Sequence, residues 1–171
     1  LPETAFACIG DFIAESLAAA CEYGMREIVV ACMAGKLCKY AAGFENTHAH
    51  KVSQDMDLLR AEVRKHLPGE EALHDALAHS VSVREALLSI PEADRPGILR
   101  RLARTALGQF ARRCGENIVL RLLVFDFEGQ FLFEEKRGEQ KEPEKNGKFF
   151  SGQSDPSHAS ASSPEAPTAR S

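Results

Sequence analysis

Several common functional signatures are absent from this sequence of 171 residues. No apolar run approaches the roughly 20 residues that a membrane-spanning helix needs, and no secretory signal peptide is visible. There is no Gly-x-Gly-x-x-Gly loop, no nucleophilic serine elbow and no HExxH helix. These absences argue against a membrane protein, a common dinucleotide-binding enzyme, an α/β-hydrolase and a zinc protease.

An excess of positive charge is lacking as well. The sequence has 21 Lys and Arg against 25 Asp and Glu, which gives a formal net charge of -4. A protein whose main partner is nucleic acid needs a basic face for the phosphates, so no nucleic-acid partner is expected. The hydrophobic share of 44% is that of an ordinary globular domain with a core.

Cysteine pairs with metal-ligand spacing are also missing. The five cysteines show no CxxC arrangement and have apolar neighbours: Cys8, Cys21, Cys32, Cys38 and Cys114. Their odd number and their surroundings predict reduced core thiols in a reducing compartment, so a cytoplasmic location is expected. No Cys/His group has the spacing of zinc ligands, so no metal site is expected.

The apolar pattern predicts an α/β domain. Strands are expected at Thr4–Ile9, Glu27–Cys32, Asn117–Phe127 and Gln130–Phe133, the last two forming a C-terminal β-hairpin. Helices are expected between Asp11 and Gly24 and at Lys36–Ala42, Val52–His66, Glu70–His79, Val83–Ile90 and Arg95–Cys114. Strands that alternate with helices favour a three-layer fold with a mostly parallel sheet, although four strands make that sheet short.

The composition changes near residue 134, where a mixed charge run gives way to a segment rich in Ser, Pro, Ala and Gly. Such a segment buries too little apolar surface to offset its chain entropy. We therefore expect a domain over residues 1–134 and a disordered tail over residues 135–171. Because Leu1 is not an initiator methionine, the chain is expected to be processed, trimmed or a fragment.

The densest chemical pattern follows the strand expected at Glu27–Cys32. Gly35 and Lys36 stand where that strand should end, and Lys39 lies one helical turn beyond Lys36 on the same face. Glycine permits a tight turn, the amides of a helix start attract anions, and lysine adds a point charge. The pattern predicts an anion-binding pocket at the carboxyl end of the sheet. A turn glycine and solvated lysines explain it nearly as well, and a Walker A loop is excluded by the missing spacer and Ser/Thr.

Polar residues after this helix extend the candidate site. Gly43 is expected to end the helix, and Asn46, Thr47 and His48 then offer an amide, a hydroxyl and an imidazole in consecutive positions. Asn and Thr are also ordinary cap and turn residues. His48 is the candidate general base or polar contact, because the ordinary pKa of histidine is about 6.5.

Gly10 and Asp11 follow the first expected strand. Adjacent parallel strands end on the same side of a sheet, so Asp11 is expected near Gly35 and Lys36. A carboxylate there can contact a ribose or a cationic sulfonium. The alternative, which the residue by itself favours, is that Asp11 is the N-cap of the following helix.

These residues resemble the signature of a known family. The segment 35–43, Gly-Lys-Leu-Cys-Lys-Tyr-Ala-Ala-Gly, followed by Asn-Thr-His at 46–48, is similar to Gly-Lys-x-x-Lys-x-Ala-Ala-Gly-x-x-Asn-Thr-His. That signature belongs to the CbiD family, the cobalt-precorrin-5B C(1)-methyltransferases of anaerobic cobalamin biosynthesis. The flank at residues 8–13 and the late strands at 118–133 also resemble this family, so the resemblance covers roughly residues 1–134.

The resemblance implies a Rossmann-like domain. It also implies that an N-terminal domain and the first strand are absent from this chain. The expected protein partner is therefore that N-terminal domain or a second copy of the chain in a homo-oligomer. It implies methyl transfer from S-adenosylmethionine to C-1 of cobalt-precorrin-5B, giving cobalt-precorrin-6A, with cobalt present only in the corrin tetrapyrrole substrate. It also implies a proton acceptor, His48, and a set of substrate- or cofactor-binding residues: Gly10, Asp11, Gly35, Lys36, Lys39, Gly43, Asn46, Thr47 and His48. The lysines would contact carboxylates of the corrin or of S-adenosylmethionine.

The sequence departs from the family pattern at several positions. Met33 and Ala34 stand where the family often has His-Ile, Ala49 where it often has Ser, and Ser53 and Asp55 where it usually has an Asp-x-Arg pair. Two other readings stay open beside the methyltransferase. One is a non-catalytic fragment that binds an anionic ligand without its partner domain, and the other is an interaction domain with a disordered tail.

Overall fold

The computed structural model describes residues 6–47, 52–115 and 117–138, all within one compact unit, Leu1–Lys141; for residues 52–55 it describes the backbone alone. Within these ranges the elements follow in the order α1 (Ile13–Glu22), β1 (Glu27–Met33), α2 (Ala34–Ala41), α3 (Val52–His66), α4 (Glu71–His79), α5 (Val83–Ser89), α6 (Arg95–Cys114), β2 (Val119–Phe125) and β3 (Phe131–Arg137). The six helices expected from apolar spacing are therefore confirmed, with shifts of a few residues at their ends.

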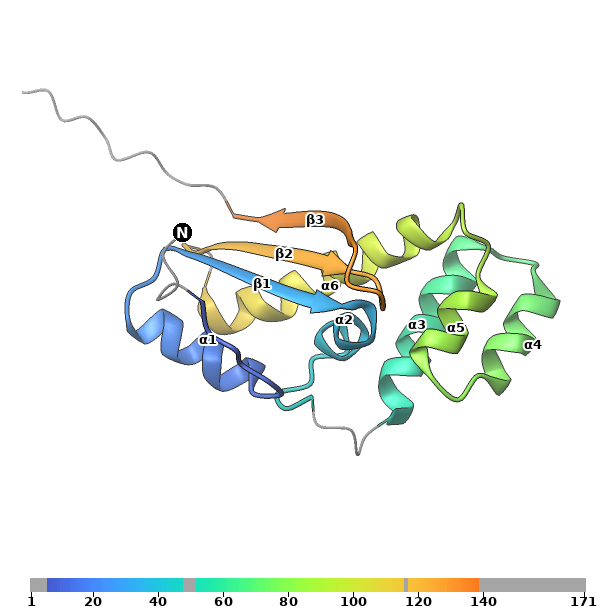
Figure 1. Ribbon diagram of the computed structural model, residues 1–171, viewed down its shortest axis with the longest axis horizontal. Coiled ribbons are helices and arrows are strands. Elements are labelled where there is room, and N and C mark those ends of the chain that lie inside the picture. Colours follow the sequence, from blue (N-terminus) through green and yellow to red (C-terminus); the bar gives the residue numbers. More distant parts are fainter. Residues whose placement is uncertain (1–5, 48–51, 116, 139–171) are drawn as a thin grey trace, which may run out of the picture. The chain divides into compact units, whose positions relative to one another are not determined.

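The three strands form one mixed sheet in the order β1-β2-β3 (Figure 1). β1 pairs with β2 in parallel, with Val30 opposite Leu122, and β2 pairs with β3 in antiparallel fashion, with Leu122 opposite Glu135. The expected C-terminal hairpin is confirmed, but a mostly parallel sheet is not, because parallel and antiparallel pairs occur once each among the described strands. The crossover from β1 to β2 runs through α2 to α6.

The strand expected at Thr4–Ile9 is wrong for the residues that the structure describes. Residues 6–9 have no regular structure, and Phe6, Ala7 and Cys8 are exposed. The Ile9 carbonyl accepts a hydrogen bond of 3.0 Å from the amide of Phe12, closing a turn around Gly10, whose φ is 55°. A short apolar run before a glycine has the same sequence pattern as a buried strand. Here the side chains of residues 6–8 are exposed, so the run is not part of a sheet.

Helices cover one face of the sheet, so the described part has two layers and not the three that were expected. Val30 and Cys32 of β1 are buried under the helices, whereas the intervening Val29 and Met33 are 41% and 50% exposed. The alternation is that of a strand with one buried and one open face. The covering core comes mainly from α6, which begins with Pro at its first turn and buries Ile98, Leu99, Leu102, Ala103, Ala106, Leu107, Phe110 and Ala111.

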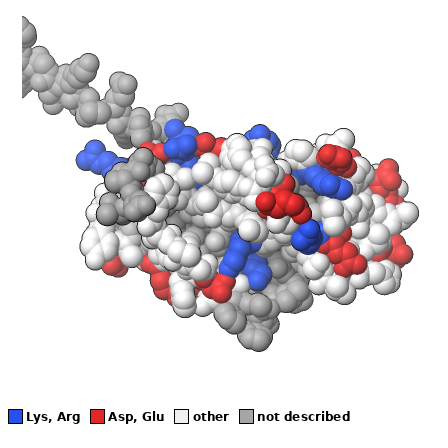
Figure 2. All heavy atoms as spheres, in the orientation of Figure 1, with Lys and Arg blue, Asp and Glu red and all other residues white. Residues whose placement is uncertain are grey.

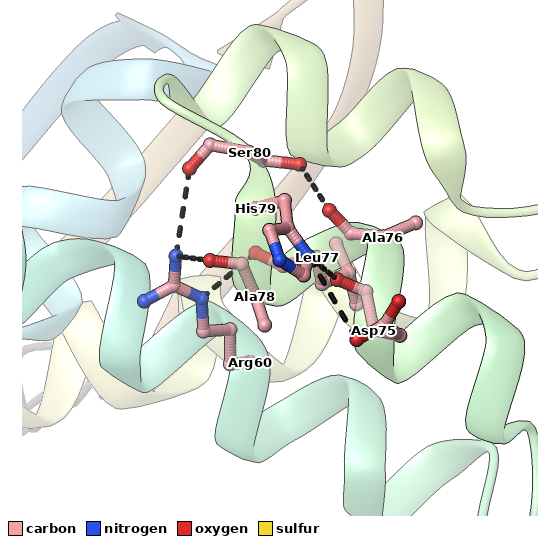
Figure 3. Close-up of polar contacts among 7 residues, drawn as sticks. All are labelled: Arg60, Asp75, Ala76, Leu77, Ala78, His79 and Ser80. Atoms are coloured by element: carbon pink, nitrogen blue, oxygen red, sulfur yellow. Dashed lines mark hydrogen bonds and ion pairs between the residues drawn. The ribbon is translucent and has the colours of Figure 1, made fainter.

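α3, α4 and α5 form a separate group of helices, toward which the carboxyl ends of β1 and β2 point (Figure 1). Arg60 of α3 joins two members of this group. Its Nε donates to the Leu77 carbonyl at 2.9 Å, and its Nη2 donates to the carbonyls of Ala78 and Ser80 at 3.1 and 3.4 Å (Figure 3). The last carbonyls of a helix have no partner within it, so Arg60 satisfies the C-terminal end of α4.

β3 continues to Arg137, beyond the domain boundary that composition placed at residue 134. Its charged end is held by ion pairs, since Arg121 of β2 binds both Glu134 of β3 and Glu27 of β1, the latter at 3.1 Å. A charge run can therefore belong to an edge strand when its acidic side chains are paired, as Glu134 is with Arg121 and Glu135 with Arg100 and Arg104. Residues 139–171, where the tail is expected, lie outside the described residues.

Charged side chains of both signs are interspersed on the face drawn in Figure 2. Lys and Arg occur there in several separate groups, with Asp and Glu close to most of them. The charges on that face are therefore mixed and do not form one continuous basic surface. Within the described ranges, none of the helices combines the length and apolar character needed to cross a membrane.

Candidate ligand-binding site at the start of α2

The candidate site surrounds the junction between β1 and α2. β1 ends at Met33 and α2 begins with Ala34, so Gly35 lies inside the first helical turn and not in a turn before the helix. A Cβ built on Gly35 would meet nothing nearer than Cε1 of Phe127, at 3.9 Å. The expectation that Gly35 permits a tight turn is wrong, because the strand passes directly into the helix. Packing against the residues that the structure describes does not require a glycine at this position.

α2 directs Lys36 and Lys39 away from the core. Its other side buries Leu37, Cys38 and Tyr40, which lie against the rest of the fold. Residues three apart lie on the same face of a helix, so the two lysines project together toward the loop that follows α2. The helical spacing read from the sequence is thus confirmed for this pair.

Lys36, Asp11 and Thr47 form a closed polar cluster. The Lys36 ammonium forms an ion pair with Asp11 and donates to Thr47 Oγ1 at 2.6 Å. The Thr47 hydroxyl in turn donates to Asp11 Oδ1 at 2.9 Å. The side chains of Lys36 and Asp11 keep 35% and 30% of their exposure, whereas Thr47 is only 2% exposed. The cluster is therefore half open to solvent, with a buried hydroxyl at its base.

Backbone hydrogen bonds hold the two segments of the cluster together. The Thr47 amide donates to the Asp11 carbonyl at 3.0 Å, and the Ala14 amide donates to the Glu45 carbonyl at 3.2 Å. Lys39 adds a third link, since its Nζ donates to the Thr47 carbonyl at 2.8 Å. The proximity of Asp11 and Lys36 was expected from parallel strand ends, but the chain achieves it by pairing residues 11–14 with the loop 45–47.

The alternative role of Asp11 as a helix N-cap is wrong. α1 begins at Ile13 with Phe12 as its N-cap residue, and no side chain caps it. The Asp11 carboxylate instead accepts hydrogen bonds from Lys36 and Thr47. Asp11 is therefore engaged by the Lys36 ammonium and the Thr47 hydroxyl, and its side chain does not cap α1.

Each lysine retains capacity for a further acceptor. An ammonium group has three N–H donors. The contacts above use two donors of Lys36 and one of Lys39. An anionic ligand at this half-open position would therefore extend the cluster without having to break it.

The two candidate glycines outside α2 have backbone roles. Gly43 has a φ of 80° and follows the end of α2, where its amide donates to the Tyr40 carbonyl and the Phe44 amide to the Lys39 carbonyl. This is the usual left-handed helix stop. Gly10 has a φ of 55° at the turn before α1. Both glycines position the neighbouring polar segments.

Of the two remaining candidates, the structure describes only Asn46. Asn46 is exposed next to the buried Thr47. His48, the candidate proton acceptor, lies outside the described residues, as does Ala49.

Two ionisable groups beneath the cluster stay neutral at physiological pH. Burial raises the pKa of the Cys32 thiol to about 12 despite the nearby Lys36 ammonium. Burial, Cys32 and Asp11 together raise the pKa of Tyr40 to about 12. Cys32 is therefore a core thiol and not a nucleophile, because the thiolate is the reactive form.

All five cysteines are free thiols. Cys32 and Cys38 are buried, and Cys21 and Cys114 are half-buried, as expected for core residues, but Cys8 is exposed because the strand expected around it does not form. Among the described residues, no three His, Cys, Asp or Glu side chains are grouped so that they could hold a metal ion.

Sequence reasoning missed the residues that follow β2. β1 and β2 are parallel, so Asp126 and Phe127 emerge at the same edge of the sheet as the start of α2. Phe127 lies beside Gly35, as the 3.9 Å separation given above shows. The expected strand ran to Phe127 and so included both residues, whereas β2 ends at Phe125 and leaves them at the strand end.

Comparison with known proteins identifies the family of the chain. Residues 46–136 match the family described as CbiD, C-terminal domain. The chain is 34% identical over 134 residues to the cobalt-precorrin-5B C(1)-methyltransferase of Pelobacter propionicus, covering 78% of this chain and 33% of that protein. It is 34% identical over 140 residues to the protein of the same name from Methylococcus capsulatus, covering 78% and 35%.

A third relative of the same name, from Variovorax paradoxus, is 32% identical over 139 residues, covering 78% of this chain and 37% of that protein. The chain thus spans about a third of the length of these relatives. No solved structure matches the chain. Because the family match extends over more than half of its residues, the chain belongs to the CbiD family and contains its C-terminal domain.

Proposed function

We propose that this chain forms the C-terminal part of a cobalt-precorrin-5B C(1)-methyltransferase and binds an anionic group at the start of α2. The observation that carries the proposal is the cluster of Asp11, Lys36, Lys39 and Thr47 in a chain of this family. The relatives are named for methyl transfer to a cobalt-precorrin. The reaction would place this chain in anaerobic cobalamin biosynthesis.

The proposed methyl donor is S-adenosylmethionine, with cobalt-precorrin-6A as the product. In a direct displacement, the bond from the methyl carbon to the sulfonium sulfur breaks while the bond to C-1 of the corrin precursor forms. S-adenosylhomocysteine then leaves as a neutral sulfide. Such a step depends on positioning and charge complementarity and needs no covalent nucleophile. The neutral Cys32 thiol agrees with this requirement.

Lys36 and Lys39 would contact a carboxylate, either of the polycarboxylate corrin or of the methyl donor. Asp11 holds Lys36 toward the loop, and Thr47 links the two. Asn46 and His48 would line the ligand side of this loop, with His48 as the proton acceptor. Gly35 would allow a ligand to approach the backbone amides of the first turn of α2.

A second candidate function is a non-catalytic fragment that binds an anionic ligand. Two observations favour it: the chain spans about a third of its relatives' length, and Asp11 already compensates the charge of Lys36. In this case the ligand would bind but no methyl group would move.

A methyl-transfer assay separates these functions. The chain is incubated with cobalt-precorrin-5B and S-adenosylmethionine carrying a labelled methyl group, and label at C-1 of the corrin is measured. We expect transfer by the wild type, reduced at least tenfold in Lys36→Ala and His48→Ala. Lys136→Ala, which changes an exposed lysine on β3, is the matched control. Binding of the corrin without transfer of label would favour the non-catalytic fragment.

A further inference from the structure

A cavity of about 360 Å³ opens at the carboxyl ends of β1 and β2, beside the polar cluster but not part of it. It is lined from the start of α2 by Ala34, from the segment after β2 by Asp126 and Phe127, and from α5 and α6 by Leu87 and Leu99. Figure 1 shows both parallel strands pointing toward this side of the domain. Ligands of open α/β sheets bind at such strand ends, and the volume is within the about 300–1,000 Å³ of ligand pockets.

The walls of the cavity are largely apolar. Leu87 and Leu99 belong to the buried core, and Phe133 closes one side from β3. Phe127 brings an aromatic ring, which the Arg84 guanidinium covers at 5.2 Å from the ring centroid. A flat apolar ligand that stacks on an aromatic ring suits these walls.

The positive charges of the walls are engaged within the protein. Arg95 donates from Nε to the Ile90 carbonyl at 2.8 Å and from Nη2 to the Leu88 carbonyl at 3.0 Å. Arg100 forms an ion pair of 3.2 Å with Glu135 and lies over the Phe133 ring. Both guanidinium groups therefore already have partners within the protein, and they hold the residues of the cavity wall in place.

The lining holds three acidic side chains, Glu92, Asp126 and Glu128, against two arginines, Arg95 and Arg100, so its charge is slightly negative. Glu92 and Asp126 both line it, and a third acid, Glu128, is paired with Arg84 at 2.8 Å. Asp126 Oδ1 accepts from the amides of Glu128 and Gln130, which fixes the carboxylate at the end of β2. Carboxylates favour hydroxyl donors and cations and repel other carboxylates, so a polycarboxylate corrin is a poor occupant.

We propose that this cavity binds the adenosine part of a nucleoside-sulfonium methyl donor, an assignment that rests on the proposed function. The base stacks on Phe127, the ribose hydroxyls donate to Glu92 or Asp126, and the sulfonium lies within the acidic field of these groups. The amino-acid end of the donor points past Ala34 and Gly35 toward Lys36. The two sides of the α2 start would thus bind groups of opposite charge. The acidic side chains of the cavity would face the cationic nucleoside, and the lysines of α2 would face carboxylates.

Calorimetric titration with adenosine tests this assignment, because adenosine lacks the carboxylate that Lys36 would bind. We expect the full 171-residue chain to bind adenosine, with affinity about tenfold lower in both Glu92→Gln and Phe127→Leu. Glu92 is exposed, so its substitution leaves the fold intact. Glu71→Gln, an exposed acid in the first turn of α4 outside the cavity, is the matched control. Lys36→Ala is expected to leave adenosine affinity unchanged but to weaken S-adenosylhomocysteine binding.

Failure of this inference differs from failure of the proposed function. Equal adenosine affinity in wild type, Glu92→Gln and Phe127→Leu would overturn the cavity assignment, and so would the absence of adenosine binding by the wild type. In either case methyl transfer that depends on Lys36 would keep the proposed function intact. Adenosine binding that needs Glu92 and Phe127, in a chain that transfers no methyl group, would support the cavity and contradict the catalytic role.

Discussion

At the scale of single residues, Thr47 is the junction of the candidate site. It is only 2% exposed, its hydroxyl lies between Lys36 and Asp11, and its carbonyl accepts from Lys39. A buried hydroxyl with two partners costs free energy if the partners are lost. Thr47 therefore contributes both to stability and to the geometry of the candidate site.

The exchange Thr47→Val keeps the volume of the side chain but removes its hydroxyl. We expect the free energy of unfolding to fall by about 1–3 kcal/mol, because both hydrogen bonds disappear in a buried position. Urea unfolding followed by circular dichroism measures the change. Thr105→Val is the matched control, since Thr105 is exposed on α6. Equal stability of the two variants would mean that the Thr47 hydroxyl does not stabilise the cluster.

The two glycines at the ends of α2 should respond to alanine in opposite directions. Gly35 is inside the helix and has space for a Cβ, so Gly35→Ala should stabilise the fold by about 0.5–1 kcal/mol. Gly43 has a φ of 80°, and its Cβ would lie 3.3 Å from Gln109, so Gly43→Ala should destabilise it by about 1 kcal/mol or more. Thermal unfolding of both variants gives the signs, and a destabilised Gly35→Ala would contradict this account.

The same substitution at Gly35 has a second readout. If a ligand approaches the first turn of α2, then Gly35→Ala weakens binding even though it stabilises the protein. A stabilised variant with unchanged ligand affinity would show that Gly35 has no role in the site. The comparison separates a functional glycine from a structural one.

Much of the site could be predicted from single residues, but one correct prediction, the proximity of Asp11 to Lys36, rested on a wrong structural reason. The spacing of Lys36 and Lys39 fixes their common face, because helical periodicity depends only on sequence separation. The proximity of Asp11 was predicted from a strand that does not form, and the loop 45–47 takes its place. The bond between Lys36 and Thr47 joins residues whose mutual orientation depends on tertiary structure, which no local pattern contains.

At the scale of elements, one side chain completes α4. Arg60 of α3 donates to the carbonyls of Leu77, Ala78 and Ser80, so two helices share its guanidinium (Figure 3). Three charge-assisted hydrogen bonds to carbonyls that lack helical partners exceed what a surface ion pair contributes.

We expect Arg60→Ala to lower the free energy of unfolding by about 1–3 kcal/mol. Arg60→Lys should recover only part of this loss, because an ammonium cannot reproduce the planar fork of donors. Arg64→Ala, an exposed arginine one turn later in α3, is the matched control. Denaturant unfolding of the three variants checks the order, and an Arg60→Ala variant as stable as Arg64→Ala would refute the capping role.

Helices were easier to predict than strands in this chain. Each helix has an apolar stripe with the 3.6-residue period, together with stop signals such as Gly43 and Gly115, and these are local features. A strand depends on a partner, so the apolar run near Ile9 looks like a strand but none forms in residues 6–9. The number of layers depends on which faces of the sheet are covered by helices. Val29 and Met33 are apolar, so the sequence does not reveal that their face of β1 is exposed.

At the scale of the whole molecule, stability should decline at alkaline pH. The pKa of Cys32 and that of Tyr40 are both raised to about 12 by burial in the folded state. The unfolded chain releases these protons at the lower ordinary pKa values, so stability from these groups is complete below about pH 9 and is lost as pH rises toward 12. Each group contributes a slope of about 1.4 kcal/mol per pH unit in that window.

Tyr40→Phe isolates one of the two groups while keeping the ring that packs edge-on against Phe110 at 5.4 Å. We expect a shallower loss of stability above pH 10 in this variant. Tyr23→Phe is the matched control, because Tyr23 is 85% exposed. Urea unfolding across pH 7–11 gives the slopes, and identical slopes in wild type and Tyr40→Phe would show that the phenol is not protected by folding.

The proposal that this chain is the C-terminal part of a methyltransferase depends most on the cluster at the start of α2. Calorimetric titration of S-adenosylhomocysteine into the chain, with Lys36→Ala and Lys136→Ala beside it, tests this claim most directly. The account predicts binding by the wild type and by Lys136→Ala, and affinity about 10- to 100-fold lower in Lys36→Ala, as expected for the loss of a charge-assisted contact. Equal affinity in all three proteins would contradict a contact between Lys36 and the carboxylate of the methyl donor, because the ligand would then bind without the cluster.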